Sequence, residues 1–290
     1  MITRQKILVT GSDGQLGKEL QEIASSFPVY EFIFLPRTGL AIDDIEGIHT
    51  YFKTHHPQYL VNCAAYTAVD KAEQEKELAF RVNGEAVGAL ASICKEQSCK
   101  FIHISTDYVF DGTATIPYKE NAATNPPGVY GASKLAGEKK ALQFNPDSLI
   151  IRTSWVYSEF GKNFVKTMLK LLQEKEEISV VNDQLGSPTY ARDLAEAILQ
   201  IISSQNWQKG IYHFSNDGII SWFDFAVAIK ELTGSVCKIN PIPTSQYPTA
   251  AKRPPYSGLD TLKIRETYGV KPVPWKASLT ACIQRLKGSL

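Results

Sequence analysis

The chain has 290 residues and a nearly balanced charge, with 31 basic and 30 acidic side chains and a formal net charge of +1. This balance gives no support for a nucleic-acid or membrane surface, and no apolar run approaches the roughly 20 residues of a membrane span. The length suits one large domain, or a domain with a smaller lobe.

The first half of the chain alternates short apolar runs with helical segments. The predicted strands cover residues 6–10, 32–35, 59–63, 101–105 and 148–152. The predicted helices cover residues 18–25, about 44–54, 71–95 and 130–144. This alternation predicts an α/β fold of the Rossmann type, a doubly wound parallel sheet with helices on both faces.

The pattern changes after residue 154, where elements become shorter and Gly and Pro punctuate them. Further helices are predicted at residues 160–175, 190–203, 221–233 and 276–285. We divide the chain into a sheet domain of residues 1–154 and a smaller C-terminal α/β lobe of residues 155–290. We expect the lobe to lie over the carboxyl edge of the sheet and the chain to cross between the two parts.

The five cysteines favour a reducing compartment. They are odd in number and no two have CxxC spacing, and Cys94 and Cys99 lack the companion ligands of a zinc site. Residues 1–6 lead straight into an apolar strand without the long apolar run of a secretory signal. We therefore expect a cytoplasmic protein with free thiols.

A glycine-rich turn with GxxGxxG spacing follows the first predicted strand and opens a helix. Glycines let a dinucleotide pyrophosphate approach the backbone, and the N-terminus of the helix supplies positive potential. The sequence therefore predicts that residues 1–154 form the domain that binds a dinucleotide cofactor. The residues predicted to bind it in this turn are Gly11, Asp13, Gly14, Gln15, Leu16 and Gly17.

Two further segments bear on the cofactor. Arg37 follows the second strand, where an acidic residue usually holds the ribose 2′-hydroxyl, and an arginine accommodates a 2′-phosphate instead. This favours NADPH, with NADH as the alternative. At the end of the third strand, small residues would let the cofactor lie against the backbone. The contacts predicted there are Ala64, Ala65, Tyr66 and Thr67.

A tyrosine and a lysine one helical turn apart supply the candidate chemistry. Tyr130 and Lys134 share one face of the predicted helix. A neighbouring ammonium favours the phenolate and lowers the pKa of the phenol from its ordinary value of about 10. Thr106, at the end of the fourth strand, could hold the same substrate oxygen. Together these three residues predict a proton-transfer device that makes or unmakes a carbinol.

We do not expect His103, His55 or His56 to act as a catalytic base. His103 lies inside the fourth predicted strand, so we expect it to be a packed core or boundary residue. His55 and His56 lack metal partners in the sequence.

Six motifs resemble those of the dTDP-4-dehydrorhamnose reductase family, within the extended short-chain dehydrogenases. The resemblance extends from about residue 5 to 285, and the motifs of the C-terminal half are the specific ones. The motifs are NCAAYTAVDKAE (62–73), STDYVFDG (105–112), VYGASKLAGE (129–138), RTSWVY (152–157), NDQLGSPT (182–189) and PTSQYP (243–248) followed by Arg253-Pro254.

The resemblance implies reduction of the 4-keto group of dTDP-4-dehydro-β-L-rhamnose (dTDP-6-deoxy-L-lyxo-4-hexulose) by NADPH to dTDP-L-rhamnose, the last step of dTDP-rhamnose biosynthesis. Hydride would attack the sugar C4, and Tyr130 would protonate the developing alkoxide. Lys134 would tune Tyr130 and hold the nicotinamide ribose, so both residues also count as cofactor contacts. The residues expected to bind the substrate are Thr106, Asp107, Trp155, Asn163 and Arg253.

Two alternatives stay open. The chain could be another nucleotide-linked 4-keto-sugar reductase or epimerase, or a non-catalytic NADP-binding subunit similar to the regulatory subunit of methionine adenosyltransferase. A sugar-nucleotide 4,6-dehydratase is disfavoured, because Tyr108 follows Asp107 where dehydratases carry a second carboxyl group. The intact Thr106, Tyr130 and Lys134 favour the enzyme.

Two positions depart from the family pattern. Ala41 stands where members often have an acidic residue, so no ribose contact is carried over there. Some members dimerise through magnesium held by glutamates. Glu19 is retained here, but Arg192 occupies a second such position, and a cation repels a metal ion. We expect no metal, and a monomer with a dimer as the alternative.

Overall fold

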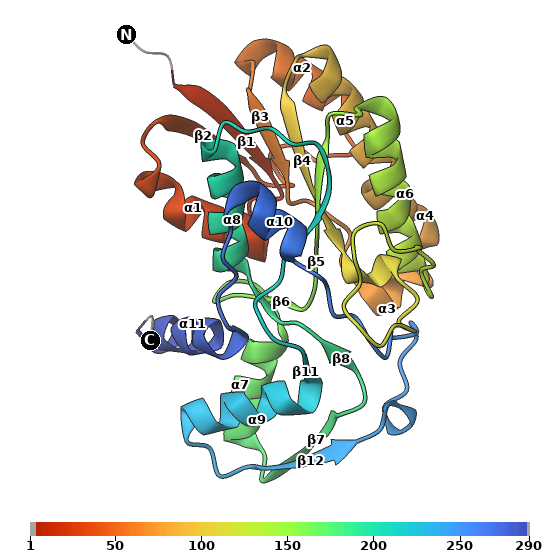
Figure 1. Cartoon of the computed structure of the whole chain (residues 1–290), viewed down its shortest axis with the longest axis vertical. Coiled ribbons are helices and arrows are strands. Elements are labelled where there is room, and N and C mark those ends of the chain that lie inside the picture. The colour runs from red at the N-terminus through yellow and green to blue at the C-terminus, as the bar shows by residue number, and fades with distance from the viewer. Residues whose placement is uncertain (1–3, 289–290) are drawn as a thin grey trace.

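The computed structural model describes residues 4–288, and its centre is a six-stranded parallel sheet in the order β10-β5-β4-β3-β1-β2 (Figure 1). The expected domain limits at residues 1–3 and 289–290 lie outside the described residues. The chain leaves β1 for β2 on one side and returns to β3 on the other. Ligands of such sheets bind at this reversal, beyond the carboxyl ends of the strands. The strands are β1 (Gln5–Thr10), β2 (Tyr30–Leu35), β3 (Tyr59–Asn62), β4 (Lys100–Thr106), β5 (Leu149–Thr153) and β10 (Gly210–His213).

Helices cover both faces of the sheet, which confirms the predicted fold class (Figure 1). Ile7 and Val9 of β1 pack against one helical layer, and Leu8 between them packs against the other. Apolar side chains on both faces are expected of a parallel sheet buried between two layers. One layer contains α1 (Gln15–Ile23), α8 (Ala191–Ser203) and α10 (Leu262–Tyr268), and the other contains α2 (Ile45–His55), α5 (Ala86–Glu96) and α6 (Val129–Phe144).

Part of the C-terminal half returns to the sheet. Leu194 and Ile198 of α8 lie in the same core cluster as Val9 of β1. Strand β10 pairs in parallel with β5, placing Ile211 opposite Ile150. The sequence did not reveal β10, because four residues are too few for a period of two to stand out.

The remaining elements form a smaller lobe at the carboxyl edge of the sheet, drawn below it in Figure 1. Its apolar side chains, among them Val165, Phe225 and Leu279, make a separate core. Among residues 4–288, no helix is long and apolar enough to cross a membrane. The lobe contains α7 (Phe164–Glu174), α9 (Trp222–Thr233), α11 (Trp275–Gly288) and the strands β6 (Val156–Tyr157), β7 (Glu177–Val181), β8 (Leu185–Gly186), β9 (Thr189–Tyr190), β11 (Ile220–Ser221) and β12 (Lys238–Ile242).

The prediction of one helix over residues 71–95 was wrong. The structure divides this segment into α3 (Val69–Ala72), α4 (Lys76–Phe80), a π-helical turn at Arg81–Glu85 and α5. The π turn carries Asn83, which donates to Ser133 Oγ of α6 at 3.0 Å and accepts from the backbone N–H of Tyr66 at 2.8 Å. The helical path is broken only at residues 73–75, and the tertiary contacts of Asn83 coincide with a local widening of the helix rather than with its end.

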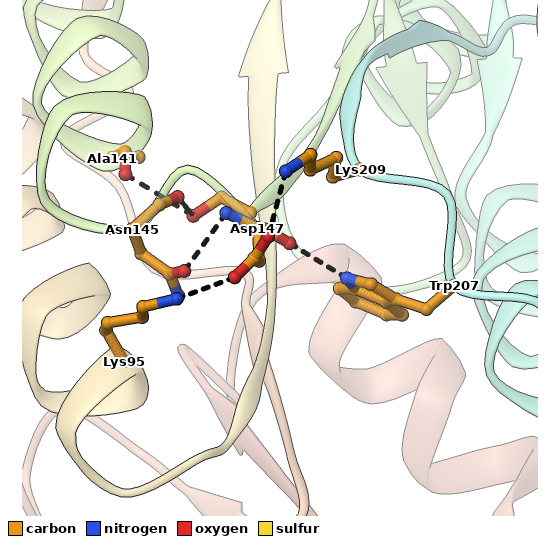
Figure 2. Close-up of polar contacts among 7 residues, drawn as sticks. Lys95, Ala141, Asn145, Asp147, Trp207 and Lys209 are labelled. Atoms are coloured by element: carbon orange, nitrogen blue, oxygen red, sulfur yellow. Dashed lines mark hydrogen bonds and ion pairs between the residues drawn. The ribbon is translucent and has the colours of Figure 1, made fainter.

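The turn after α6 joins three segments at the amino end of β5 (Figure 2). The carboxylate of Asp147 accepts from Lys95 Nζ at 2.7 Å and from Lys209 Nζ at 3.1 Å. Its carbonyl accepts from Trp207 Nε1 at 2.8 Å. Both ion pairs are half-exposed and contribute little to stability, but together with Trp207 they define where the chain enters β10.

A buried ion pair joins α6 to β5 and β4. The guanidinium of Arg152 donates to both carboxylate oxygens of Glu138, at 2.9 and 2.7 Å, and Ser105 Oγ donates to the same carboxylate at 2.5 Å. Both charged side chains are only 2% exposed, and the ring of Phe110 lies 5.0 Å from the guanidinium carbon. The pair therefore sets how α6 lies against the carboxyl end of β4.

We expect Arg152→Met to lower the free energy of unfolding by about 3–5 kcal/mol, because it leaves the carboxylate of Glu138 buried without its partner. Urea denaturation measures this change. Arg265→Met is the control, because the pair of Arg265 with Asp217 at 3.0 Å is at the surface and should be worth about 1 kcal/mol or less. A similar small loss in both variants would contradict the importance of the buried pair.

Candidate active site

A cleft of about 720 Å³ opens at the carboxyl ends of β1, β3, β4 and β5. Its walls are the glycine turn, the loops after β2, β3 and β5, the end of β4 and the first turns of α6. All the site residues predicted from the sequence line this cleft except Gly17, Asn163 and Arg253. The structure therefore brings the two groups of predicted residues, for cofactor and for chemistry, into one cavity.

The three glycines of the turn have different surroundings. Gly11 has a φ of 65°, which favours glycine, and a Cβ there would lie 2.6 Å from the backbone of Ala64. A Cβ on Gly17 would lie 2.5 Å from the Cα of Ser12, so Gly17 packs behind the turn. A Cβ on Gly14 would meet only the carbonyl of Gly11, at 3.2 Å, and would project into the cleft.

Gly14 is also the N-cap of α1, and no side chain among the described residues caps this helix end. The first amides of a helix are strong donors that need partners, and they favour an anion. The open space at Gly14 and the uncapped helix end together fit the phosphates of a dinucleotide.

The loop after β2 forms one end of the cleft. Arg37 is exposed there. Asp43, which the sequence did not single out as a site residue, lines the same wall and pairs with Arg81 at 3.1 Å. The neighbouring Asp44 accepts from the N–H of Gly47 and caps α2. Because either aspartate could cap this helix, the sequence did not distinguish the one that lines the cleft.

Tyr130 lies in the first turn of α6, and its hydroxyl is within hydrogen-bonding reach of Thr106. Burial of this hydroxyl away from water raises the pKa of Tyr130 above its ordinary value, and the hydrogen bond with Thr106 acts in the opposite direction. The expectation that Lys134 lowers the pKa of the phenol is not met here, because Lys134 Nζ is directed at the carbonyl of Ile104, 2.6 Å away. A phenol that keeps its proton is suited to donate one.

Asp107 adds an unsatisfied carboxylate oxygen to the cleft. Its Oδ1 accepts from Thr106 Oγ1 at 2.9 Å, whereas its buried Oδ2 has no hydrogen-bond partner among the described residues. Burial raises the pKa of Asp107 to about 6. Tyr108 follows it and packs edge-on against the ring of Tyr130, with the ring centres 5.5 Å apart. The free oxygen can accept a hydrogen bond from a ligand hydroxyl.

Trp155 supplies an aromatic wall. Its φ of 47° is uncommon for a residue with a side chain, and its ring stacks on Trp222 with the centres 3.5 Å apart. Gly186 lies against the ring edge, where a Cβ would be 2.6 Å from Cε2. These contacts hold the ring in a single orientation at the cleft.

Two predicted substrate residues lie beside the cleft rather than on its wall. Asn163 caps α7 and donates to Gln15 Oε1 at 2.9 Å, which connects the smaller lobe to the glycine turn. Arg253 donates to Asp70 Oδ2 at 2.6 Å and lies 3.5 Å from the hydroxyl of Tyr108. The positions of these two side chains are set by contacts between segments that are far apart in the sequence, and no local pattern indicates such contacts.

The acidic position considered for magnesium contains an ion pair. Arg192 Nη1 lies 3.9 Å from the buried carboxylate of Glu19. Within residues 4–288, no three His, Cys, Asp or Glu side chains are grouped to hold a metal ion. The absence of a metal and the monomeric state remain predictions, as does the cytoplasmic location.

The parallel sheet, the glycine turn at its reversal and the cleft with Thr106, Tyr130 and Lys134 define an oxidoreductase of the extended short-chain dehydrogenase class. A sequence model described as the RmlD substrate binding domain matches residues 5–287. The chain therefore belongs to the RmlD family of dTDP-4-dehydrorhamnose reductases.

Individual relatives agree with this assignment. The dTDP-4-dehydrorhamnose reductase of Aggregatibacter actinomycetemcomitans is 40% identical over 284 residues, covering 94% of this chain and 97% of that protein. The spore coat polysaccharide biosynthesis protein SpsK of Bacillus subtilis is 43% identical over 279 residues, covering 96% and 97%. The crystal structure of dTDP-4-dehydrorhamnose reductase from Bacillus anthracis in complex with NADP has a TM-score of 0.93 at 37% identity, covering 98% of this chain and 100% of that one.

We expect Asp107→Asn to stabilise the protein by about 1–3 kcal/mol at neutral pH, since it removes a buried charge. The pKa of Asp107 is raised from 3.8 to about 6 in the folded state. The ionised carboxylate therefore lowers the free energy of unfolding by its full amount when the pH is above about 6. The difference should shrink as the pH falls and vanish below the unfolded-state pKa. Urea denaturation at several pH values measures it.

Asp111→Asn provides a control of opposite sign. Hydrogen bonds from Thr113 lower the pKa of Asp111, so this carboxylate stabilises the folded state above its unfolded-state pKa and its removal should not help at neutral pH. A loss of stability at neutral pH in Asp107→Asn would show that the carboxylate has a partner that offsets its burial.

Proposed function

We propose that the protein reduces the 4-keto group of dTDP-4-dehydro-β-L-rhamnose with NADPH and forms dTDP-L-rhamnose. The observation that carries the proposal is the position of Tyr130 beside Thr106, in the same cleft as the uncapped N-terminus of α1. The relatives named as reductases of this sugar nucleotide, one of them in complex with NADP, support it.

The glycine turn would hold the cofactor, which supplies the hydride. Gly14 leaves room for the pyrophosphate at the amides of α1, and Gly11 keeps the turn close to Ala64. Arg37 would pair with the 2′-phosphate that distinguishes NADPH from NADH. The remaining cofactor contacts that we propose are Asp13, Gln15, Leu16, Gly17, Ala65, Tyr66, Thr67 and Lys134.

Side chains of the protein would supply the proton and the hydrogen bonds to the substrate oxygen. The hydroxyl of Tyr130 would donate its proton to the substrate oxygen at C4 as the alkoxide develops. The hydroxyl of Thr106, which donates to Asp107 Oδ1 in this structure, would turn to donate a hydrogen bond to the same substrate oxygen. Because burial raises the pKa of Tyr130, the phenol is neutral and carries the proton that this step requires. Oδ2 of Asp107 would accept from a sugar hydroxyl.

The smaller lobe would hold the sugar nucleotide against the sheet domain. The fixed ring of Trp155 offers an apolar surface for the sugar. Arg253 would pair with the pyrophosphate of the sugar nucleotide, and Asp70 holds the guanidinium close to Tyr108. Asn163 would bind the substrate from the smaller lobe, where its contact with Gln15 holds it next to the glycine turn. In this proposal residues 1–154 mainly bind the cofactor and residues 155–290 mainly bind the substrate.

Tyr130→Phe should reduce kcat by roughly 10²–10⁴-fold, because the ring remains while the proton donor is lost. The rate is followed by NADPH absorbance with the purified protein and the dTDP-linked 4-keto sugar. Tyr256→Phe is the control, since this half-buried tyrosine packs near Tyr118 and does not line the cleft. Unchanged turnover of Tyr130→Phe would remove this residue from the mechanism, and a wild-type protein that binds NADPH without turnover would favour a non-catalytic subunit.

Gly14→Val should weaken NADPH binding by about 100-fold or more, because a branched side chain fills the space above the helix N-terminus. The protein should stay folded, since a Cβ at Gly14 meets only one backbone oxygen. NADPH fluorescence titration measures the affinity. Gly288→Val is the matched control, because a Cβ there has open space around it. Wild-type affinity in Gly14→Val would mean that the phosphates bind elsewhere.

A further inference from the structure

A row of buried polar side chains crosses three strands next to the cleft. Thr10, Asn62 and His103 are register neighbours on β1, β3 and β4, and each is 0% exposed. Asn62 Oδ1 accepts from Thr10 Oγ1 at 2.7 Å, and Asn62 Nδ2 lies 3.0 Å from His103 Nδ1. On the other side of the imidazole, His103 Nε2 lies 3.4 Å from Lys134 Nζ. The expectation that His103 merely fills the core leaves this contact unexplained.

The orientation of the Asn62 amide follows from its neighbours. The backbone N–H of Ala64 points to Asn62 Oδ1 at 3.2 Å, and a peptide N–H can only donate. This atom is therefore the amide oxygen, and the NH₂ group faces His103. Because an NH₂ group donates, Nδ1 of His103 must accept, and the proton of a neutral imidazole is then on Nε2. Burial lowers the pKa of His103 well below its ordinary value, which agrees with a neutral ring.

The Nε2–H of His103 consequently faces the amine of Lys134. That amine already donates to the carbonyl of Ile104 at 2.6 Å. An ammonium has three donors and no lone pair, so it opposes the imidazole N–H, whereas a neutral amine has a lone pair that can accept from it. The imidazole therefore favours the neutral form of Lys134.

We propose that His103 is a positioning residue for Lys134, holding the amine at the cleft through Nε2–H and making it easier to deprotonate. Thr10 and Asn62 act one step further away, since they fix which imidazole nitrogen carries the proton. The importance of this for turnover rests on the proposed function, but the titration of Lys134 does not.

The other groups around Lys134 act in both directions. Burial lowers the pKa of Lys134 to about 8, while the carboxylate of Glu138 on α6 and Cys63, just after β3, act to raise it. Glu138 is already bound to Arg152. Burial raises the pKa of Tyr130, one turn earlier on α6, so this phenol adds no negative charge beside the amine. Of these neighbours, His103 is the one whose ring nitrogen lies 3.4 Å from the amine, where its N–H can donate to it.

Two substitutions of His103 separate its two hydrogen bonds. The amide of His103→Asn lies near the place of Nδ1, so it can serve Asn62 but presents no donor to Lys134. The amide of His103→Gln reaches the place of Nε2 and keeps a donor there. We expect the pKa of Lys134 to rise by about 0.5–1 pH unit in His103→Asn, the equivalent of one hydrogen bond, and to stay near the wild-type value in His103→Gln.

NMR titration of the lysine side chain measures this pKa in the full-length protein, without substrate or cofactor. His213→Asn is the control, because His213 is equally buried in the same sheet but its Nδ1 lies against the carbonyl of Tyr118. It should alter stability without moving the titration of Lys134. An unchanged pKa of Lys134 in folded His103→Asn, or equal shifts in all three variants, would overturn the proposal.

A second measurement needs no variant. The ¹⁵N spectrum of the imidazoles should show His103 as the neutral Nε2–H tautomer across about pH 6–8. A proton on Nδ1, or a charged ring in that range, would refute the assignment even if the variants fail to fold. Neither result depends on turnover, so a failure of the proposed enzymatic function would be seen separately, as a lack of NADPH oxidation.

Discussion

The geometry of the cleft depends on the buried pair of Arg152 and Glu138. Taking two charges out of water is costly, and an apolar pair of similar volume often stabilises a protein as well or better. An apolar pair, however, could not bind Ser105, whose hydroxyl donates to the same carboxylate. Because Ser105 precedes Thr106 on β4 and Glu138 lies on the helix of Tyr130, the pair aligns the two elements that supply the proposed proton donor.

The polar groups next to the cleft are arranged at a cost to stability. Oδ2 of Asp107 is buried without a partner among the described residues, and Trp155 adopts a sparsely populated backbone conformation. Lys134 is 2% exposed, so its amine must find its partners inside the protein. The apolar layers on both faces of the sheet offset these costs, since they bury the apolar side chains at the centre of the sheet. Such local strain is common where a site must be organised before its ligand arrives.

The smaller lobe is connected to the sheet domain by both backbone and side chains. After the lobe begins, the chain returns to the sheet through α8 and β10. Asn163 then contacts Gln15 beside the glycine turn, and Arg253 contacts Asp70 on α3. The smaller lobe thus keeps its own core, while α8 and β10 join the C-terminal half to the core of the sheet and the side-chain contacts bring the two parts together beside the cleft.

The sequence by itself determined the first five strands of the sheet, the position of the dinucleotide turn and the common face of Tyr130 and Lys134. All three depend on local patterns: runs of apolar residues, glycines at a fixed spacing, and the four-residue repeat of a helix. The motifs shared with the reductases also determined the family.

Only the tertiary structure decided the features that depend on distant partners. It ended the first part of the helix expected over 71–95 at Ala72, and it placed a π-helical turn around Asn83, which binds across to α6. It added β10 to the sheet, where pairing with β5 compensates for a weak local signal. It also directed Lys134 toward Ile104 and His103 rather than toward the phenol of Tyr130. Spacing along one chain cannot specify such contacts, because burial and hydrogen-bond partners are set by strands and helices that meet only in the folded protein.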